Sequence, residues 1–198
     1  MKLQLLIMIV SLTAMPMSVF GQSISDHYIR VSGPESFFAD ATTQGHTTTN
    51  MYTGKIEVLV GGTWYNSPSD EYDAWYRFRY GGQILPSPTH DGHAMTIGFD
   101  GCSWVQECGG TNIRDWTIFH EGVGFVTPGF TAIPEYSDTH VYHFVMDIDT
   151  IYSQITLGVG DGGVYDNSGG MSVTLYQLQE HPVPVESSTW GAIKATYQ

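Results

Sequence analysis

Apolar and polar residues alternate along much of the chain, and this alternation predicts short β-strands. Residues 55–60 show it most simply, with apolar side chains at every second position: Ile56, Val58 and Val60. The same period recurs in residues 73–80, 140–148 and 171–175. Because successive side chains of a strand point to opposite faces, each segment has one apolar face that can be buried in a core.

Clusters of Gly, Pro, Ser, Asn and Asp separate these segments and predict turns, for example at residues 66–70 and 85–88. No amphipathic helical run of useful length precedes residue 186. Short strands with regular turn residues between them are typical of an antiparallel β-sandwich or barrel. The sequence therefore predicts an all-β fold.

The two ends of the chain depart from this pattern. Residues 1–21 combine one early Lys, an apolar run and a Val-Phe-Gly end, so we expect a cleaved secretory signal peptide rather than a buried N-terminal helix. Residues 22–180 then form the β-sandwich domain. Residues 181–198 begin with His-Pro-Val-Pro, which predicts a linker, and end in a short tail that is either helical or a sorting signal. We expect a secreted protein, extracellular or on the cell surface.

The charge balance narrows the range of partners. Seven Lys and Arg stand against 20 Asp and Glu, which gives a formal net charge of −13 at pH 7. Without a basic stripe, nucleic acid and anionic membrane surfaces are poor partners. No stop-transfer segment follows the signal, so membrane insertion is not expected. This acidity suits a soluble exported protein or one that binds divalent cations.

The chain has two cysteines, Cys102 and Cys108. In an exported protein they are expected to close a small disulfide loop. Their spacing is not the Cys-x-x-Cys of redox sites, and they are too few to form a structural zinc site.

The segment Gly-Val-Gly-Asp-Gly-Gly-Val-Tyr-Asp-Asn-Ser-Gly-Gly at 158–170 has the composition of a ligand-binding loop. It matches the glycine spacing of a dinucleotide-binding loop, but a strand follows it where that motif needs a helix. Asp161, Asp166 and Asn167 instead supply the hard oxygen ligands that Ca²⁺ prefers. The alternative is a polar hairpin stabilised by Asx turns.

Other chemistry receives little support from the sequence. His140 and His143 are spaced so that, in a strand, their side chains point to opposite faces, which argues against a shared metal. His90 and His93 have the same spacing but fall in a Pro-rich loop, where a zinc site is a minor alternative. No Gly-x-Ser-x-Gly is present, and His120-Glu121 lacks the second His of a zinc protease. Three scattered carboxylates are expected at the surface or in turns: Asp73, Glu121 and Asp138. We therefore expect a protein that is not an enzyme.

Residues 155–175 resemble the C-terminal calcium loop of the galactose-binding bacterial lectins of the PA-I type, in which strand, Asp, Gly-containing loop, Asp/Asn-Asn-Ser-Gly and strand follow one another. Residues 93–98 and 124–129 resemble a second stretch of that family, and residues 56–65 resemble an early strand. The resemblance implies a jelly-roll-like, galactose-binding-domain-like sandwich of two antiparallel sheets.

The resemblance also implies a ligand set. Ca²⁺ would be held by Asp161, Asp166 and Asn167, by a loop carbonyl at Val164 and by an early-strand carbonyl near Asn66. In the lectins, sugar hydroxyls complete the calcium shell. This chain departs from them in a shorter loop and in lacking a copy of their His-Pro-Asp-Gln element.

A carbohydrate would contact two of the calcium ligands, Asp161 and Asn167, and four further side chains: His90, Asp91, Trp64 and Tyr165. The pair His90-Asp91 occupies a place comparable to that of the missing His-Pro-Asp-Gln element, and the aromatic rings would stack on the sugar.

The leading hypothesis is thus a secreted, calcium-dependent, carbohydrate-binding module. A structural or surface-assembly protein, in which Ca²⁺ only makes the loop rigid, is the alternative, and homo-oligomers are compatible with both. A glycan-active enzyme is the third hypothesis.

Overall fold

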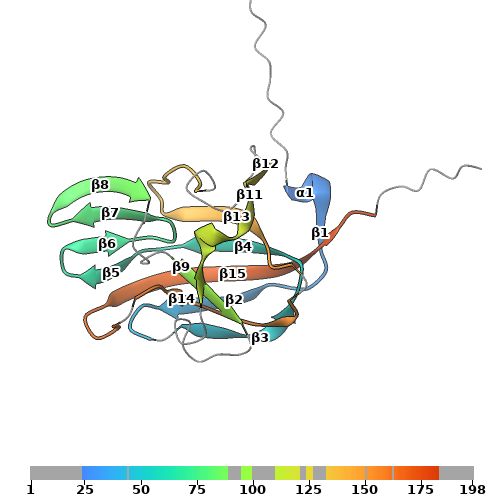
Figure 1. The fold of residues 1–198 in the computed structure, drawn as a ribbon, viewed down its shortest axis with the longest axis horizontal. Helices are drawn as coiled ribbons and strands as arrows, with labels where there is room; N and C mark the ends of the chain where they lie inside the picture. The colour runs from blue at the N-terminus through green and yellow to red at the C-terminus, as the bar shows by residue number, and fades with distance from the viewer. Residues whose placement is uncertain are drawn as a thin grey trace, which may run out of the picture.

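The protein is a sandwich of two antiparallel sheets (Figure 1), seen in a computed structural model that describes residues 24–43, 45–88, 95–99, 110–120, 124–126, 133–149, 151–161 and 163–182. Every strand pairing in these residues is antiparallel. The predicted antiparallel β-sandwich is confirmed. The predicted signal peptide, both cysteines and the residues after 182 lie outside the described residues.

The large sheet runs in the order β12-β11-β13-β4-β15-β5-β6-β7-β8, with β1 and β2 also paired to β15. Its strands are β1 (Tyr28–Arg30), β2 (Glu35–Asp40), β4 (Lys55–Gly61), β5 (Trp64–Ser67), β6 (Asp70–Tyr72), β7 (Tyr76–Tyr80), β8 (Gln83–Pro88), β11 (Thr117–His120), β12 (Gly124–Val126), β13 (Val141–Asp147) and β15 (Ser168–Glu180).

The small sheet runs in the order β10-β9-β14-β3. Its strands are β3 (His46–Tyr52), β9 (Met95–Phe99), β10 (Thr111–Asn112) and β14 (Ser153–Val159). A single-turn helix α1 (Ile24–His27) precedes β1, and a 3-10 turn η1 (Ile113–Asp115) follows β10. Among the described residues, no helix is long and apolar enough to cross a bilayer.

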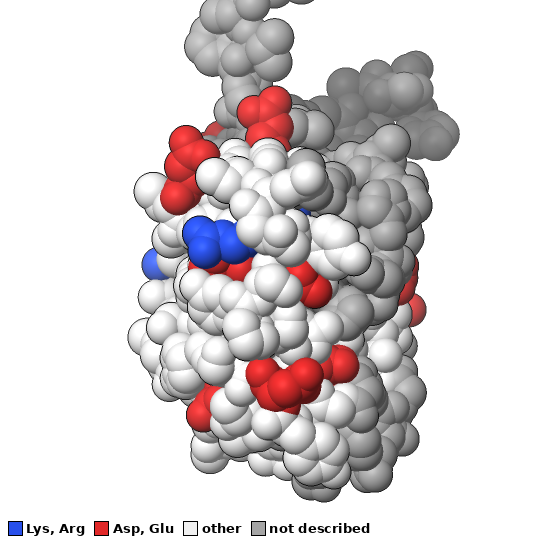
Figure 2. Space-filling model, turned by 90° about the vertical axis from the view of Figure 1, so that its left-hand side faces the viewer, with Lys and Arg blue, Asp and Glu red and all other residues white. Residues whose placement is uncertain are grey.

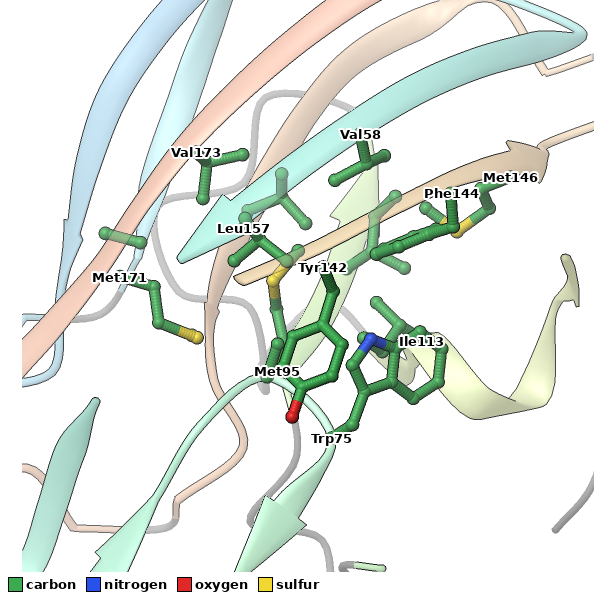
Figure 3. Close-up of a cluster of buried hydrophobic side chains, with 14 of the residues drawn as sticks. Val58, Trp75, Met95, Ile113, Tyr142, Phe144, Met146, Leu157, Met171 and Val173 are labelled. Atoms are coloured by element: carbon green, nitrogen blue, oxygen red, sulfur yellow. The ribbon is translucent and has the colours of Figure 1, made fainter. Parts of the chain in front are cut away.

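The core between the sheets is formed by the apolar faces that the alternation predicts. Ile56, Val58 and Val60 of β4 are at most 1% exposed, and Tyr142, Phe144 and Met146 of β13 pack beside them. Figure 3 shows how side chains from both sheets meet there, with Trp75 and Ile113 closing one side. Burying these large side chains is the main favourable term in folding.

The outer face of the large sheet carries a second, smaller cluster. Helix α1 and β1 bring Ile24 and Tyr28 against a patch of apolar side chains on β11, β13 and β15: Phe119, Val145 and Leu178. Beside this cluster, Glu57 of β4 is only 2% exposed, and it accepts hydrogen bonds at 2.6 and 2.7 Å from Arg30. The N-terminal segment is therefore held to the sheet by both apolar contacts and an ion pair.

Two sequence expectations are wrong. Residues 85–88 were expected to be a turn, yet they lie in β8, an edge strand that pairs only with β7. Prolines are tolerated there because one side of an edge strand needs no hydrogen-bond donors. Asp73, expected at the surface or in a turn, does lie in a turn, but exposure at the surface is wrong because it is fully buried.

Candidate functional site

The loop between β14 and β15, residues 160–167, lies at one end of the sandwich, where the orange segment turns back into β15 in Figure 1. Two glycines at the start of β15 allow other segments to approach this loop closely. A Cβ atom on Gly169 would lie 2.7 Å from the carbonyl oxygen of Thr63, and one on Gly170 would lie 2.4 Å from that of Ala39. Gly169 also has a φ of +79°, which favours glycine.

Three chain segments therefore meet at the loop. On one side, the backbone N–H of Ala41 donates to the carbonyl of Gly169 at 3.0 Å. On the other side, the N–H of Gly170 donates to the carbonyl of Thr63 at 3.0 Å, and Ser168 pairs with Tyr65 of β5. The β2–β3 turn and β5 thus flank the loop on opposite sides.

Asn167 is the most buried polar side chain of the loop. It is 6% exposed, and its Nδ2 donates to the carbonyl oxygen of Ala41 at 3.1 Å. That bond fixes the orientation of the amide. Its Oδ1 is buried and has no hydrogen-bond donor among the described residues.

Asp161 also has a buried side-chain oxygen without a donor among the described residues, and this oxygen belongs to a carboxylate. Its Oδ1 accepts a hydrogen bond from the N–H of Gly163 at 3.3 Å, whereas its Oδ2 is buried without a donor among the described residues. A buried carboxylate oxygen without a donor is unfavourable, because the water that solvated it is not replaced. Buried acceptors normally have a positively charged or donating partner, and a cation is one kind of partner that each of these two oxygens lacks.

The other predicted metal ligands lie in the same loop or in the neighbouring strand β5. Asp166 is exposed and Val164 is half-buried in the same loop. Asn66 lies in β5, where continuing the Ser168–Tyr65 register places it opposite Asn167. It is also the extra residue of a β-bulge, because Tyr65 pairs with Glu71 and Ser67 pairs with Asp70. Bulges re-aim backbone groups and are common beside functional sites.

A cation in this loop would be bound by oxygens of several kinds. Among the described residues, no three His, Cys, Asp and Glu side chains lie close enough together to bind a metal by themselves. A site here needs the Asn167 amide and backbone carbonyls as well, which is the mixed oxygen set that Ca²⁺ takes. Figure 2 shows this end of the molecule, and its lower part carries acidic atoms and no basic ones.

The predicted carbohydrate-contacting residues separate into three groups. Tyr165, at the tip of the loop, is 99% exposed, so its ring is free to contact a ligand. Trp64 is fully buried and stacks on Tyr72 with ring centroids 4.9 Å apart, which corrects its predicted role as a surface platform. His90 and Asp91 lie outside the described residues.

The sequence analysis missed a buried hydrogen-bonded cluster that is centred on the carboxylate of Asp73. Oδ1 of Asp73 accepts hydrogen bonds from the backbone N–H groups of Trp75 and Tyr76, at 2.9 and 2.7 Å. Oδ2 is 2.8 Å from the hydroxyl of Tyr142 and 3.0 Å from Nδ1 of His140. The sequence signal for this cluster is the aspartate itself, because an Asp that binds the N–H groups two and three residues later forms an Asx turn.

The environment of this cluster changes the acidity of its tyrosines. Burial raises the pKa of Tyr142, and the negative charge of Asp73 raises it further. Burial and Asp73 also raise the pKa of Tyr76. Both hydroxyls therefore stay protonated and donate hydrogen bonds, Tyr76 to the carbonyl of Pro134 at 2.5 Å. The cluster is a saturated hydrogen-bond network rather than an open site.

Glu57, on the polar face of β4, is a second carboxylate whose two oxygens both accept hydrogen bonds from protein side chains. Oε1 of Glu57 lies 2.6 Å from Nε2 of His143, in addition to the two bonds from Arg30. The guanidinium of Arg30 stacks on the ring of Tyr176 at 4.0 Å. Burial alone would raise the pKa of Glu57, but the hydrogen bonds from Arg30 and His143 outweigh it and lower that pKa to about 2. His140 and His143 thus bind different carboxylates.

Comparison with known proteins does not assign the chain to a family. No family model matches the sequence, and no curated protein matches it. Among solved structures, the chain is similar to the N-terminal domain of EclA, described as a PllA-like lectin, at 15% sequence identity. The match covers 79% of this chain and 99% of that domain, with a TM-score of 0.41. At this level of similarity the match does not assign a function.

Proposed function

We propose that the protein is a secreted, calcium-dependent, carbohydrate-binding module whose site is the β14–β15 loop. The observation that carries this proposal is the pair of buried oxygens, Oδ2 of Asp161 and Oδ1 of Asn167, that have no donor among the described residues. The resemblance of residues 155–175 to the calcium loop of bacterial lectins supports the same ion and the same kind of ligand.

The residues of the loop fit Ca²⁺. Asp161 and Asn167 would bind the ion with their donor-free oxygens, and Asp166 and the carbonyls of Val164 and Asn66 are the further candidates. All are hard oxygen ligands, as Ca²⁺ prefers, and the exposed position of Asp166 leaves one side of the loop open to solvent. The ion supplies coordination positions that sugar hydroxyls can fill in place of water.

Tyr165 supports the choice of a carbohydrate as the ligand. A tyrosine that is 99% exposed contributes nothing to the core, whereas aromatic rings bind the apolar faces of sugars through stacking contacts. It lies one residue from Asp166 and two from Asn167, so a sugar bound at the ion would meet its ring. His90 and Asp91 remain predicted contacts.

A structural role for the ion is the second candidate. The bond from Asn167 to Ala41 ties the loop to the β2–β3 turn, so an ion could serve only to hold the two segments together. In that case calcium would stabilise the protein and no glycan would bind.

Thermal unfolding with and without calcium tests the ion. A ligand that binds only the folded state raises the midpoint of unfolding, so we expect a rise in millimolar calcium that EGTA reverses. Asp161→Ala should abolish this rise, and Asp138→Ala, which removes an exposed carboxylate elsewhere, should preserve it. A wild-type midpoint that does not respond to calcium would show that the loop holds no calcium.

A glycan array, read in calcium and again in EGTA, tests the ligand. We expect calcium-dependent binding that Tyr165→Ala weakens by about fivefold, since a stacked ring contributes roughly 1 kcal/mol. Tyr152→Ala is the matched control, because Tyr152 is 67% exposed and precedes the opposite end of β14. Calcium binding without any glycan binding would favour the structural role.

A further inference from the structure

The β2–β3 turn, residues 40–43, lies against the proposed cation loop. Ala41 contacts it twice, through its N–H to the carbonyl of Gly169 and through its carbonyl from Nδ2 of Asn167. Asp40 pairs with Gly170 at the start of β15. Thr42 and Thr43 are exposed next to these contacts. The turn therefore presents polar side chains beside the loop without taking part in the proposed binding of the ion.

Asp40 is held in a fixed orientation within this turn. Its Oδ1 accepts two hydrogen bonds from Thr42, at 2.8 Å from the backbone N–H and 2.7 Å from the hydroxyl. The hydroxyl of Thr43 donates to the backbone carbonyl of Asp40 at 2.9 Å. Neither bond to the carboxylate uses Oδ2, and within the described residues Asp40 takes part in no ion pair. Oδ2 is thus an oriented acceptor for which the described residues provide no donor.

Asn167 connects this turn to the proposed ion. Its Nδ2 donates to Ala41, while its Oδ1, in a side chain 6% exposed, has no protein donor among the described residues. A cation on Oδ1 polarises the amide and strengthens the hydrogen bond that the other end of the amide donates. Binding of the ion and the position of the turn are therefore coupled through one side chain.

We infer that the β2–β3 turn is a second subsite of the carbohydrate site, in which Oδ2 of Asp40 accepts a hydroxyl from the sugar next to the one bound at the ion. This inference rests on the proposed function and extends it. The ligand class is a neutral oligosaccharide of at least two sugars, since the carboxylate of Asp40 attracts hydroxyl donors and repels sugars that carry carboxylate or sulfate groups.

Asp40→Asn tests the subsite, because it keeps an oxygen for the two bonds from Thr42 and replaces the free acceptor with an amide donor. The probes are neutral di- to tetrasaccharides that bind on the array and the corresponding monosaccharides, measured by calorimetry in calcium. We expect oligosaccharide affinity to fall by about tenfold, the usual worth of one charge-assisted hydrogen bond, with monosaccharide and calcium affinities unchanged. Asp138→Asn is the control.

Three outcomes would overturn the subsite. The first is an unchanged oligosaccharide affinity in Asp40→Asn, and the second is an equal loss for mono- and oligosaccharides. The third is a loss of calcium affinity, which would place the Asp40 carboxylate at the ion. A wild-type protein that binds calcium and monosaccharides keeps the proposed function intact in all three cases, so the two failures are distinguishable.

Hydrogen exchange tests the coupling through Asn167. In the wild type, calcium should slow exchange at the amide of Ala41, which is bonded to Gly169, and at those of Thr42 and Thr43, which are bonded to Asp40. Asn167→Asp keeps an oxygen for the ion but loses the donor to Ala41. It should still bind calcium, yet calcium should no longer slow exchange in the turn. Equal slowing in both proteins would show that the coupling does not run through Asn167.

Discussion

Asp161 and Asp73 are both aspartates in tight turns, but they differ in how many hydrogen bonds their carboxylate oxygens accept. Asp73 is fully buried, and its two oxygens have four protein partners, from Trp75, Tyr76, Tyr142 and His140. Asp161 has one bond at 3.3 Å to one oxygen, and its other oxygen is buried without a donor among the described residues.

This difference separates structural from ligand-binding carboxylates better than acidity or burial does. A buried carboxylate with every oxygen satisfied stabilises the fold and has no capacity left for a ligand. A carboxylate whose oxygen is shielded from water without a donor is unfavourable in the protein alone, and only a further partner relieves it. The contrast yields three predictions, in order of decreasing effect.

Removing the saturated carboxylate should have the largest effect. Asp73→Ala leaves two buried N–H groups, the Tyr142 hydroxyl and His140 without their acceptor, so we expect the free energy of unfolding to fall by about 4 kcal/mol. Asp73→Asn should cost less, because its amide oxygen still accepts two bonds. Urea denaturation in EGTA measures both. If Asp161→Ala costs as much under the same conditions, the contrast between the two sites is invalid.

Glu57 predicts that the stability of the protein depends on pH. Its pKa in the folded protein is about 2, below its usual 4.5, so its stabilisation is complete above about pH 4.5 and is lost as the pH falls toward 2. We expect Glu57→Gln to be less stable than the wild type at pH 6, with the difference shrinking as the solution is acidified. Urea denaturation at a series of pH values checks this. A difference that stays constant down to pH 2.5 would rule out the ion pair with Arg30 as its cause.

The smallest effect concerns Asp161 itself and has the opposite sign. In EGTA, Asp161→Asn removes a charge whose oxygen has no donor among the described residues, so the free energy of unfolding should rise by about 1 kcal/mol. In millimolar calcium the order should reverse, because only the wild type gains the binding energy of the ion. Thermal unfolding in both buffers measures the crossing. A variant less stable than the wild type in both buffers would show that Asp161 supports the fold rather than a ligand.

Alternation along the chain was enough to predict the fold because it reports directly on which side chains enter the core. It gave the buried residues of β4, β13 and β15 correctly. It could not show what covers the other face of a strand. Glu57 alternates with the apolar residues of β4 and so lies on its other face, where Arg30, 27 residues earlier in the chain, binds it and it is almost fully buried.

In the candidate sites, too, the sequence revealed the residues of one short loop but not their contacts with distant segments. Asp161 and Asn167 were identified from the composition of one short loop, and the structure then showed that each has an oxygen without a donor among the described residues. The link from Asn167 to Ala41 spans 126 positions, and that from Asp73 to His140 spans 67. Such contacts depend on the packed sheets, so no pattern within either segment reveals them.

The central position of β15 sets the order in which the protein can be built. This strand, residues 168–180, pairs with β1, β2, β4 and β5, so segments from across the first third of the chain are held together by one of its last elements. Such long-range pairing makes folding slow. A chain still emerging from a ribosome lacks the strand on which the large sheet assembles, so β1 and β2, whose pairings within the described residues are with β15, stay without that partner until it arrives.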